Sequence, residues 1–306
     1  MMVYPVNTMT TETLPIALCS DKNYFAHLAT AVVSLLETNP IIVGDIYLLV
    51  NDLPAETGDI LCSHVRSNYG AEIQIIQVPD AAMEGIGVSG HWTLGTYLKL
   101  FLGEFLPQHL DKVLFLDSDV IVVGDLKDLF ASAETLAKSR VAVLAAVPET
   151  DSGRHLSRWG FSGDAYFNAG VMLINLTTWR NHNVGSHLQS IARSMQGHLP
   201  VHDQDVLNLV LEDNWITLPN EFNELRRLEI PPETKIVHFA SADKPWKTGN
   251  RHPAKSQYKR YRNQTPFPYK TEFDAQNIYR NLVSSSMRRR LGPIVNKLRD
   301  AGLIRR

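Results

Sequence analysis

The stretch VLFLDSDVIV, residues 113–122, places two acidic residues in the middle of an apolar run, and such a run predicts a buried strand. In an extended strand, side chains two residues apart project from the same face, so Asp117 and Asp119 are expected to converge on one point. Converging carboxylates repel each other unless a cation lies between them, and their oxygens suit magnesium or manganese. The alternative is a strand that ends in a turn, where aspartate serves only the turn geometry.

Strand-like and helix-like segments alternate around this stretch, which predicts an α/β fold with a mixed, mostly parallel sheet flanked by helices. Strands are expected at 14–19, 46–50, 72–78, 113–122, 141–147, 165–176 and 235–240, and helices at about 24–38, 54–70, 93–106, 184–196 and 203–212. Because ligands bind beyond the carboxyl ends of parallel strands, we expect residues 19–24, the aspartate pair and His238 to converge. The long polar segment 149–164 is typical of a functional loop.

Length and composition limit the class of protein. With 306 residues, of which 44% are apolar, the chain can bury one large core. A net charge of −2 argues against a nucleic-acid partner. Two cysteines without a metal or redox spacing predict a reducing, cytoplasmic environment. The first twenty residues lack the pattern of a signal peptide, and no apolar run reaches the length of a membrane span.

The C-terminal end differs in charge from the rest of the chain. Residues 287–306 have a balance of +6, against −8 for the remainder. We therefore expect a catalytic domain at 1–260 and a basic, helical extension at 261–306. Apolar residues interleave with the arginines as in an amphipathic helix that binds anionic membranes. A solvated terminus would show the same pattern.

Five blocks in a fixed order carry a resemblance to a known family. They are SDKNY (20–24), TYLKL (96–100), FLDSDVIV (115–122), FNAGVMLINL (167–176) with DQDVLN (203–208), and HFASADKPW (238–246). In this order they resemble glycosyltransferase family 8, the retaining sugar-nucleotide transferases of GT-A fold, over about residues 14–247. The resemblance implies a GT-A domain that binds a UDP-sugar together with a divalent metal.

The resemblance also implies which side chains hold the metal and the leaving group. The implied ligands of Mn²⁺ or Mg²⁺ are Asp117, Asp119 and His238. Lys244 is implied as the cation that neutralises a phosphate oxygen, and Ser118 as a donor-binding residue. Ser241 is assigned to the same donor site, although the family usually has glycine there and glycine allows a closer backbone approach.

The first block is implied to bind the nucleotide. Asp21 and Asn23 offer an acceptor and a donor for a uracil edge, and Tyr24 offers a flat ring for stacking. Asp21 would equally serve to cap the helix that follows, and the two roles are compatible.

Three further residues are implied to surround the transferred sugar: Asn168, Asp203 and Gln204. Asp203 and Gln204 are the expected catalytic residues. An amide is a poor nucleophile, so we expect Gln204 to stabilise positive charge at the anomeric carbon while the departing diphosphate takes the acceptor proton. Lys99 stands where the family usually has arginine. Lysine keeps the positive charge but cannot form the two parallel hydrogen bonds of a guanidinium group. Glu149 is a candidate for an acidic residue that touches the sugar.

Together these residues predict a retaining, manganese-dependent transferase. It would move galactose or glucose from a UDP-sugar to a hydroxyl of a surface glycan, a lipid-linked oligosaccharide or a lipopolysaccharide-type acceptor, at the inner face of the cytoplasmic membrane. Two alternatives remain. A haloacid-dehalogenase-like phosphatase also has an apolar strand followed by DxD, but carries it on its first strand. A non-catalytic sugar-nucleotide-binding protein would not need all three metal ligands.

Overall fold

A seven-stranded sheet forms the centre of the molecule. The computed structural model describes residues 13–41, 43–87, 93–149, 166–195, 202–225, 229–282 and 297. Within them the strands of this sheet are ordered β3-β2-β1-β4-β7-β6-β8. They are β1 (Leu14–Asp21), β2 (Val43–Asn51), β3 (Ile73–Gln77), β4 (Lys112–Leu116), β6 (Leu144–Pro148), β7 (Phe167–Asn175) and β8 (Trp215–Thr217). Only β7 runs antiparallel to its neighbours in this sheet, which confirms the predicted mixed, mostly parallel topology.

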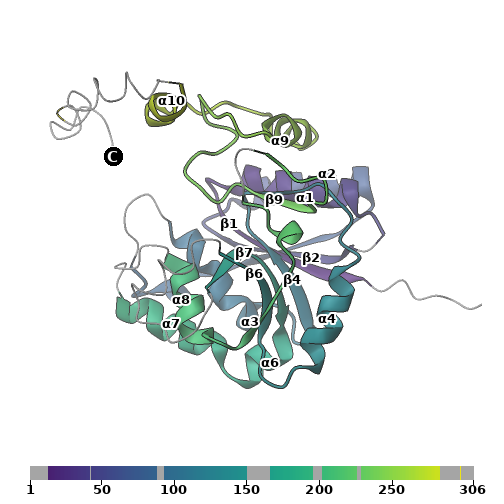
Figure 1. Ribbon diagram of the computed structural model, residues 1–306, viewed down its shortest axis with the longest axis vertical. Helices are drawn as coiled ribbons and strands as arrows, with labels where there is room; N and C mark the ends of the chain where they lie inside the picture. Colours follow the sequence, from purple (N-terminus) through teal and green to yellow (C-terminus); the bar gives the residue numbers. More distant parts are fainter. Residues whose placement is uncertain are drawn as a thin grey trace, which may run out of the picture.

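Helices cover both faces of the sheet (Figure 1). One face packs against α1 (Phe25–Thr38), α2 (Ala55–Tyr69) and α4 (Leu129–Lys138). The other packs against η2 (Leu94–Phe101), α3 (Leu102–Phe105), α6 (Leu176–Asn181), α7 (Val184–Met195) and α8 (His202–Leu211). Alternate residues of β1 divide between the two cores: Leu18 joins the first and Ala17 the second, as a period of two requires. Burial of both faces explains why the strands read as continuous apolar runs.

The helix predicted at 93–106 has two geometries, because η2 is a 3-10 helix and α3 is α-helical. The remaining predicted helices, and the predicted strands of the central sheet outside the aspartate stretch, lie within a few residues of their expected bounds. The strand β8 and the helices α4 and α6 were not predicted.

The prediction that 113–122 is a single strand was wrong. β4 ends at Leu116, and β5 (Val120–Val122) begins a second, two-stranded sheet with β9 (Ile236–His238). The intervening Asp-Ser-Asp turns the chain, because these residues disfavour strands and favour turns. The predicted strand at 235–240 likewise pairs antiparallel with β5 and lies outside the central sheet. The Val122 amide donates to Ser34 Oγ at 2.9 Å, which ties β5 to α1.

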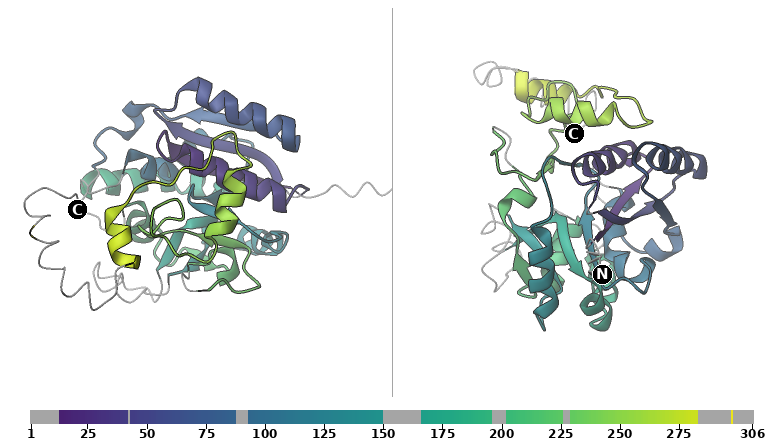
Figure 2. Two further views of the ribbon diagram at one scale, coloured as in Figure 1. Left: turned by 90° about the horizontal axis from the view of Figure 1, so that it is seen from above. Right: turned by 90° about the vertical axis from the view of Figure 1, so that its right-hand side faces the viewer.

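Two further helices, α9 (Lys255–Arg262) and α10 (Ala275–Leu282), lie on the α1 side of the molecule (Figures 1 and 2). Tyr258 and Tyr261 of α9 pack with Val33 of α1 and with Trp246. The predicted domain boundary at residue 260 falls inside α9 and stays a prediction. The predicted basic helix at 287–306 lies outside the described residues except for Lys297, as does the predicted loop 149–164 except for Glu149. Among the helices that are described, none is both long and apolar enough to span a bilayer.

Candidate active site

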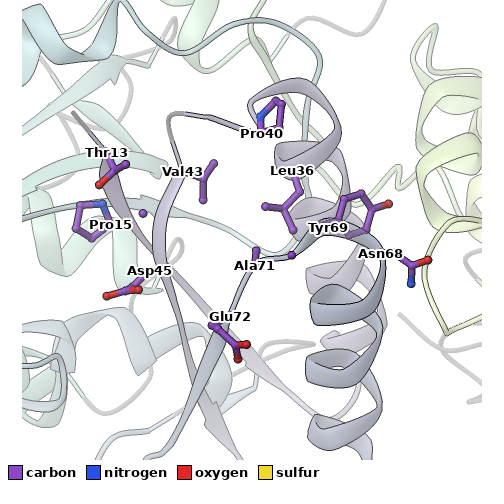
Figure 3. A pocket seen from close by; sticks show the side chains of 12 residues that line it. Thr13, Pro15, Leu36, Pro40, Val43, Asp45, Asn68, Tyr69, Ala71 and Glu72 are labelled. Carbon is purple, nitrogen blue, oxygen red and sulfur yellow. The ribbon is translucent and has the colours of Figure 1, made fainter. Parts of the chain in front are cut away.

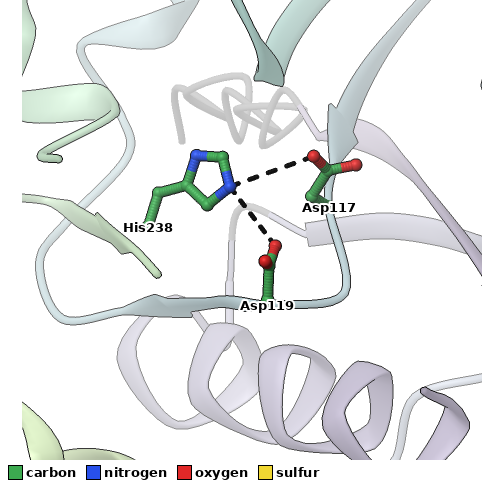
Figure 4. A group of neighbouring side chains, drawn as sticks. All are labelled: Asp117, Asp119 and His238. Atoms are coloured by element: carbon green, nitrogen blue, oxygen red, sulfur yellow. Dashed lines mark ion pairs between the residues drawn. The ribbon is translucent and has the colours of Figure 1, made fainter. Parts of the chain in front are cut away.

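Asp117, Asp119 and His238 come together at the carboxyl edge of the sheet (Figure 4). One potential ligand atom from each lies within 4.8 Å of the others. His238 Nε2 is 3.9 Å from Asp117 Oδ2 and 3.3 Å from Asp119 Oδ1. The carboxylates converge because of the turn between β4 and β5, whereas the sequence argument attributed this to strand periodicity. Two carboxylates and an imidazole are a donor set that fits Mn²⁺ or Mg²⁺.

Gly170 of β7 makes room for the histidine ring. A β carbon at this position would lie 2.1 Å from His238 Cε1 and 2.5 Å from Nδ1, so any larger residue would collide with the ring. The Gly170 carbonyl also accepts a hydrogen bond from the Asp117 amide at 2.8 Å. One glycine therefore positions both a carboxylate and the imidazole. A glycine inside a strand often marks such a close approach, and this signal was present in the block FNAG.

Lys244 places a positive charge beside the same cluster. Its ammonium donates to Asp119 Oδ2, and to the Phe239 carbonyl at 2.6 Å. Burial by itself would raise the pKa of Asp119, but the charges of Lys244 and His238 outweigh this effect and hold that pKa below its usual range. Asp119 is therefore ionised at neutral pH.

Lys99 connects the group of Asp117, Asp119 and His238 to the start of α8. Its Nζ lies 2.8 Å from Asp117 Oδ1 and 2.6 Å from Asp203 Oδ2. Burial disfavours the ammonium, but attraction to the two carboxylates is larger and raises the pKa of Lys99. Burial raises the pKa of Asp203 to about 6 in spite of this contact. One cation shared by two carboxylates leaves a net negative charge, which suits a site for a further cation.

Polar side chains of α8 fasten its first turn to β7. Gln204 Oε1 accepts from the Ala169 amide at 3.1 Å. Asn208 accepts from the Phe167 amide at 2.8 Å and donates to the Phe167 carbonyl at 2.9 Å. The bond from the Ala169 amide orients the Gln204 side chain, and the two bonds of Asn208 hold α8 against the residues FNAG of β7. Asn208 belongs to the block DQDVLN, but no role was predicted for it.

Asn168, the predicted sugar-site residue of β7, lies between this helix and the candidate metal ligands. Its Nδ2 donates to Glu149 Oε2 at 3.0 Å, so the candidate acidic residue is adjacent to it. Asp205, the third residue of the DQD triplet, instead accepts from the Tyr166 hydroxyl at 2.7 Å. The structure therefore brings Asn168 and Glu149 together and turns Asp205 toward Tyr166.

Asp21 forms a turn between the end of β1 and the start of α1. Its Oδ1 accepts from the amides of Asn23 at 2.9 Å and of Tyr24 at 3.0 Å. The helix-capping role that the sequence allowed is therefore not formed, because the N-cap of α1 is Tyr24 and no side chain caps it. The second carboxylate oxygen of Asp21 does not take part in these two bonds. The Asn23 side chain is exposed next to it.

Tyr24 belongs to an aromatic group at the same end of the sheet. Its ring meets those of His27 and Trp246 edge-on at 5.3 and 5.9 Å, and His27 stacks on Trp246 at 3.6 Å. Burial, with a smaller contribution from the charge of Asp119, raises the pKa of the Tyr24 phenol. This group lies between the end of β1 and the segment that carries Lys244.

The two predicted serines adopt ordinary turn structures. Ser118 is half-buried in the turn between the aspartates. Ser241 Oγ accepts from the Asp243 amide at 3.1 Å. Among the described non-glycine residues, positive φ angles occur only at Asp52, Asn183 and Glu212. The backbone at Ser241 therefore lacks the positive φ angle that would favour glycine.

Asn223 was missed by the sequence analysis. It is buried at the end of η3 (Asn220–Phe222), and its Oδ1 lies 3.0 Å from His238 Nδ1. No motif surrounds it, and only the folded chain brings it to the histidine.

A separate hollow of about 620 Å³ lies at the opposite, amino edge of the sheet (Figure 3). Its lining comes from the starts of β1 and β2 and the ends of α1 and α2, and includes Thr13, Pro15, Leu36, Val43, Asp45, Tyr69 and Glu72. None of the predicted site residues lines it.

Comparisons with known proteins show the family and the fold of this chain. The family model described as Glycosyl transferase family 8 matches residues 15–249. Glycosyltransferase GlyF of Streptococcus pneumoniae is 29% identical over 246 residues, which cover 76% of this chain but only 57% of that protein. The lipopolysaccharide 1,2-glucosyltransferase of Escherichia coli is 24% identical over 285 residues, 87% of this chain and 84% of that protein. The crystal structure of galactosyltransferase LgtC with donor and acceptor sugar analogues superimposes with a TM-score of 0.70 at 23% identity, covering 83% of this chain and 96% of that one, which shows a shared GT-A-type fold.

Proposed function

Because the chain belongs to glycosyl transferase family 8, we propose that it transfers galactose or glucose from a UDP-sugar to a hydroxyl of a glycan acceptor, with retention of the anomeric configuration. One observation carries the proposal: Asp117, Asp119 and His238 converge within 4.8 Å. Lys99 connects this cluster to Asp203 on α8. Groups suited to a diphosphate and groups suited to a sugar therefore adjoin each other.

In this proposal Asp117, Asp119 and His238 hold Mn²⁺ or Mg²⁺. A metal held there would supply Lewis-acid stabilisation of the negative charge on a departing diphosphate. Lys244, whose ammonium already lies at Asp119, binds a phosphate oxygen and adds a second positive charge. Ser118 and Ser241 offer hydroxyls in the turns on either side, and Asp21, Asn23 and Tyr24 bind the uridine.

The sugar lies against Asn168, Asp203 and Gln204. Gln204 faces the anomeric carbon and stabilises its positive charge with the amide dipole, whose oxygen is already oriented by the Ala169 amide. Lys99 holds the Asp203 carboxylate by its 2.6 Å contact. The leaving diphosphate takes the proton of the acceptor hydroxyl on the same face, so the bond to the acceptor forms with retention.

The acceptor is a lipopolysaccharide-type glycan or a lipid-linked oligosaccharide. Support comes from the name of the Escherichia coli relative, a lipopolysaccharide glucosyltransferase. The enzyme works in the cytoplasm, at the inner face of the membrane, which residues 287–306 contact through their basic charge. A chain that ends at residue 282 should bind anionic vesicles more weakly and hydrolyse UDP-sugar at the same rate. Equal vesicle binding would refute the membrane contact.

The central test is UDP release from UDP-galactose, UDP-glucose and their N-acetyl analogues, with Mn²⁺ and with EDTA. The proposal expects turnover of one hexose donor that depends on the metal, and an α-linked product from an α-linked donor by NMR. Metal-independent turnover would contradict the proposed site. Release of phosphate from simple esters would support a phosphatase, and binding of UDP-sugars without transfer or hydrolysis would support a non-catalytic binding protein.

A further inference from the structure

Two buried side-chain amides connect the candidate metal site with the candidate sugar site. Asn168 and Asn223 are only 4% and 2% exposed. Asn223 Oδ1 lies 3.0 Å from His238 Nδ1, and Asn223 Nδ2 lies 2.8 Å from Asn168 Oδ1. Asn168 Nδ2 in turn donates to Glu149 Oε2 at 3.0 Å. We call this series of contacts, from His238 to Glu149, the amide ladder.

One backbone group determines which way both amides point. The Gly170 amide can only donate, and it lies 3.0 Å from the δ atom of Asn168 that faces it, so that atom is the oxygen. The Asn168 nitrogen then faces the carboxylate of Glu149, which can accept its hydrogen. Asn223 must donate to the Asn168 oxygen, so its nitrogen points there and its oxygen points to His238.

The orientation of Asn223 decides where the histidine carries its hydrogen. An amide oxygen can only accept, so His238 Nδ1 is the protonated nitrogen. Nε2 is then the ring nitrogen that faces Asp117 and Asp119. It either carries a second hydrogen that pairs with the carboxylates or, without that hydrogen, offers its lone pair to a metal ion held between them.

Backbone bonds hold Asn223 and His238 in one arrangement. The His238 amide donates to the Glu224 carbonyl at 3.0 Å, and the Glu224 amide donates to the Ile236 carbonyl at 2.9 Å. The segment after η3 is therefore fixed against β9. On its other side the histidine ring lies against Gly170, where not even a β carbon fits. The ring cannot turn over without breaking these contacts.

We infer that Asn223 is a positioning residue that prepares His238 as a metal ligand and, through Asn168, couples the ligand to the sugar pocket. This inference rests on the proposed function. Side chains that orient a ligating histidine commonly change metal affinity about 10- to 100-fold when removed. The ladder also predicts that the sugar pocket responds to changes made at the histidine.

The first test needs no substitution. The full-length chain with ¹⁵N-labelled histidine is saturated with Mg²⁺ and UDP, and two-bond ¹H–¹⁵N spectra assign the hydrogen of His238. We expect it on Nδ1. A hydrogen on Nε2 would overturn the inference. A parent chain that binds neither ion nor nucleotide would instead contradict the proposed function.

The second test removes the ladder. Asn223→Leu should raise the Kd for Mn²⁺, measured by the EPR signal of the free ion at saturating UDP, about 10- to 100-fold. Asn220→Leu is the matched control, since this asparagine lies on the same 3-10 helix with an exposed side chain. Its Kd should equal that of the parent. An unchanged Kd in folded Asn223→Leu would refute the positioning role.

The third test separates the two halves of the ladder. Asn223→Asp keeps an oxygen toward His238 Nδ1 but puts a second oxygen against Asn168 Oδ1. The Kd for Mn²⁺ should then exceed that of the parent by no more than about twofold, while the KM for the UDP-sugar rises. A loss of Mn²⁺ affinity as large as in Asn223→Leu would refute the inference. An unchanged KM for the UDP-sugar would refute the coupling between the histidine and the sugar pocket. Circular dichroism melts establish that each variant is folded.

Discussion

The amino and carboxyl edges of the central sheet differ in how they hold charge. At the amino edge, Glu72 lines the 620 Å³ hollow and pairs with Arg66, and these side chains are 58% and 62% exposed. At the carboxyl edge, the side chains of Lys99 and Asp203 are 4% and 8% exposed and lie 2.6 Å apart. An exposed pair contributes little to stability, whereas a buried charge is costly unless it is paired. Buried, converging charge therefore identifies the site better than the size of a hollow does.

The largest expected effect comes from removing the shared cation. Lys99→Met leaves the buried Asp203 and the half-buried Asp117 without their ammonium, so it should lower the free energy of unfolding in EDTA by about 3–5 kcal/mol. Lys99→Arg keeps the charge and should lose at most about 1–3 kcal/mol from the larger side chain. Urea denaturation measures both. Equal stability of the methionine variant and the parent would show that the buried charges are not held as described.

Asp119→Asn should lower kcat/KM for UDP-sugar hydrolysis about 100- to 1,000-fold, because the amide preserves the shape and removes an anionic ligand and the partner of Lys244. Coupled detection of UDP measures the rate. Asp111→Asn is a suitable control, since Asp111 is exposed just before β4. If both variants were as active as the parent, the metal site would not serve the reaction.

Gly170→Ala tests the close approach of the histidine ring. The new β carbon would lie 2.1 Å from His238 Cε1, and a ring confined by Asn223 cannot move aside freely. We expect a loss of about 1–3 kcal/mol in stability together with weaker Mn²⁺ binding. Gly58→Ala on α2 is the matched control, because the one atom closer than 3 Å to its β carbon would be Ile75 Cδ1, at the flexible end of that side chain. Calorimetric Mn²⁺ titration that gave the same Kd for both variants would contradict the crowding at Gly170.

The smallest effect is expected at the amino edge. Arg66→Ala removes the exposed pair with Glu72 and should shift the melting temperature by less than about 2 °C, and by less still in 1 M salt. Thermal melts followed by circular dichroism measure the shift. A shift as large as that of Lys99→Met would remove the contrast between the two edges.

The fold and much of the candidate site were predictable from local pattern. The helix that Pro54 opens and Gly70 ends has those bounds because proline and glycine act through the backbone at their own positions. The aspartates converge as predicted but for a different reason, since DSDV forms a turn between two sheets. Periodicity alone did not reveal this, because the apolar residues on both sides continue as strands after the turn.

Asn223 and Gly170 show where prediction ended. Gly170 lay in a quoted block and carried a usable signal, a glycine within a buried strand. Asn223 carried none, because its partners His238 and Asn168 are distant in the chain and an isolated asparagine is compatible with any loop.

By itself the sequence determined the alternation of strands and helices, the burial of both faces of the sheet, and the kinds of side chain gathered for the site, because these depend on periodicity and on the chemistry of single residues. Only the tertiary structure decided that β9 leaves the central sheet to pair with β5, that Lys99 is shared between Asp117 and Asp203, and that Asn223 lies against His238 Nδ1. Those outcomes depend on pairings between distant segments, and such pairings are selected by the packing of the whole chain.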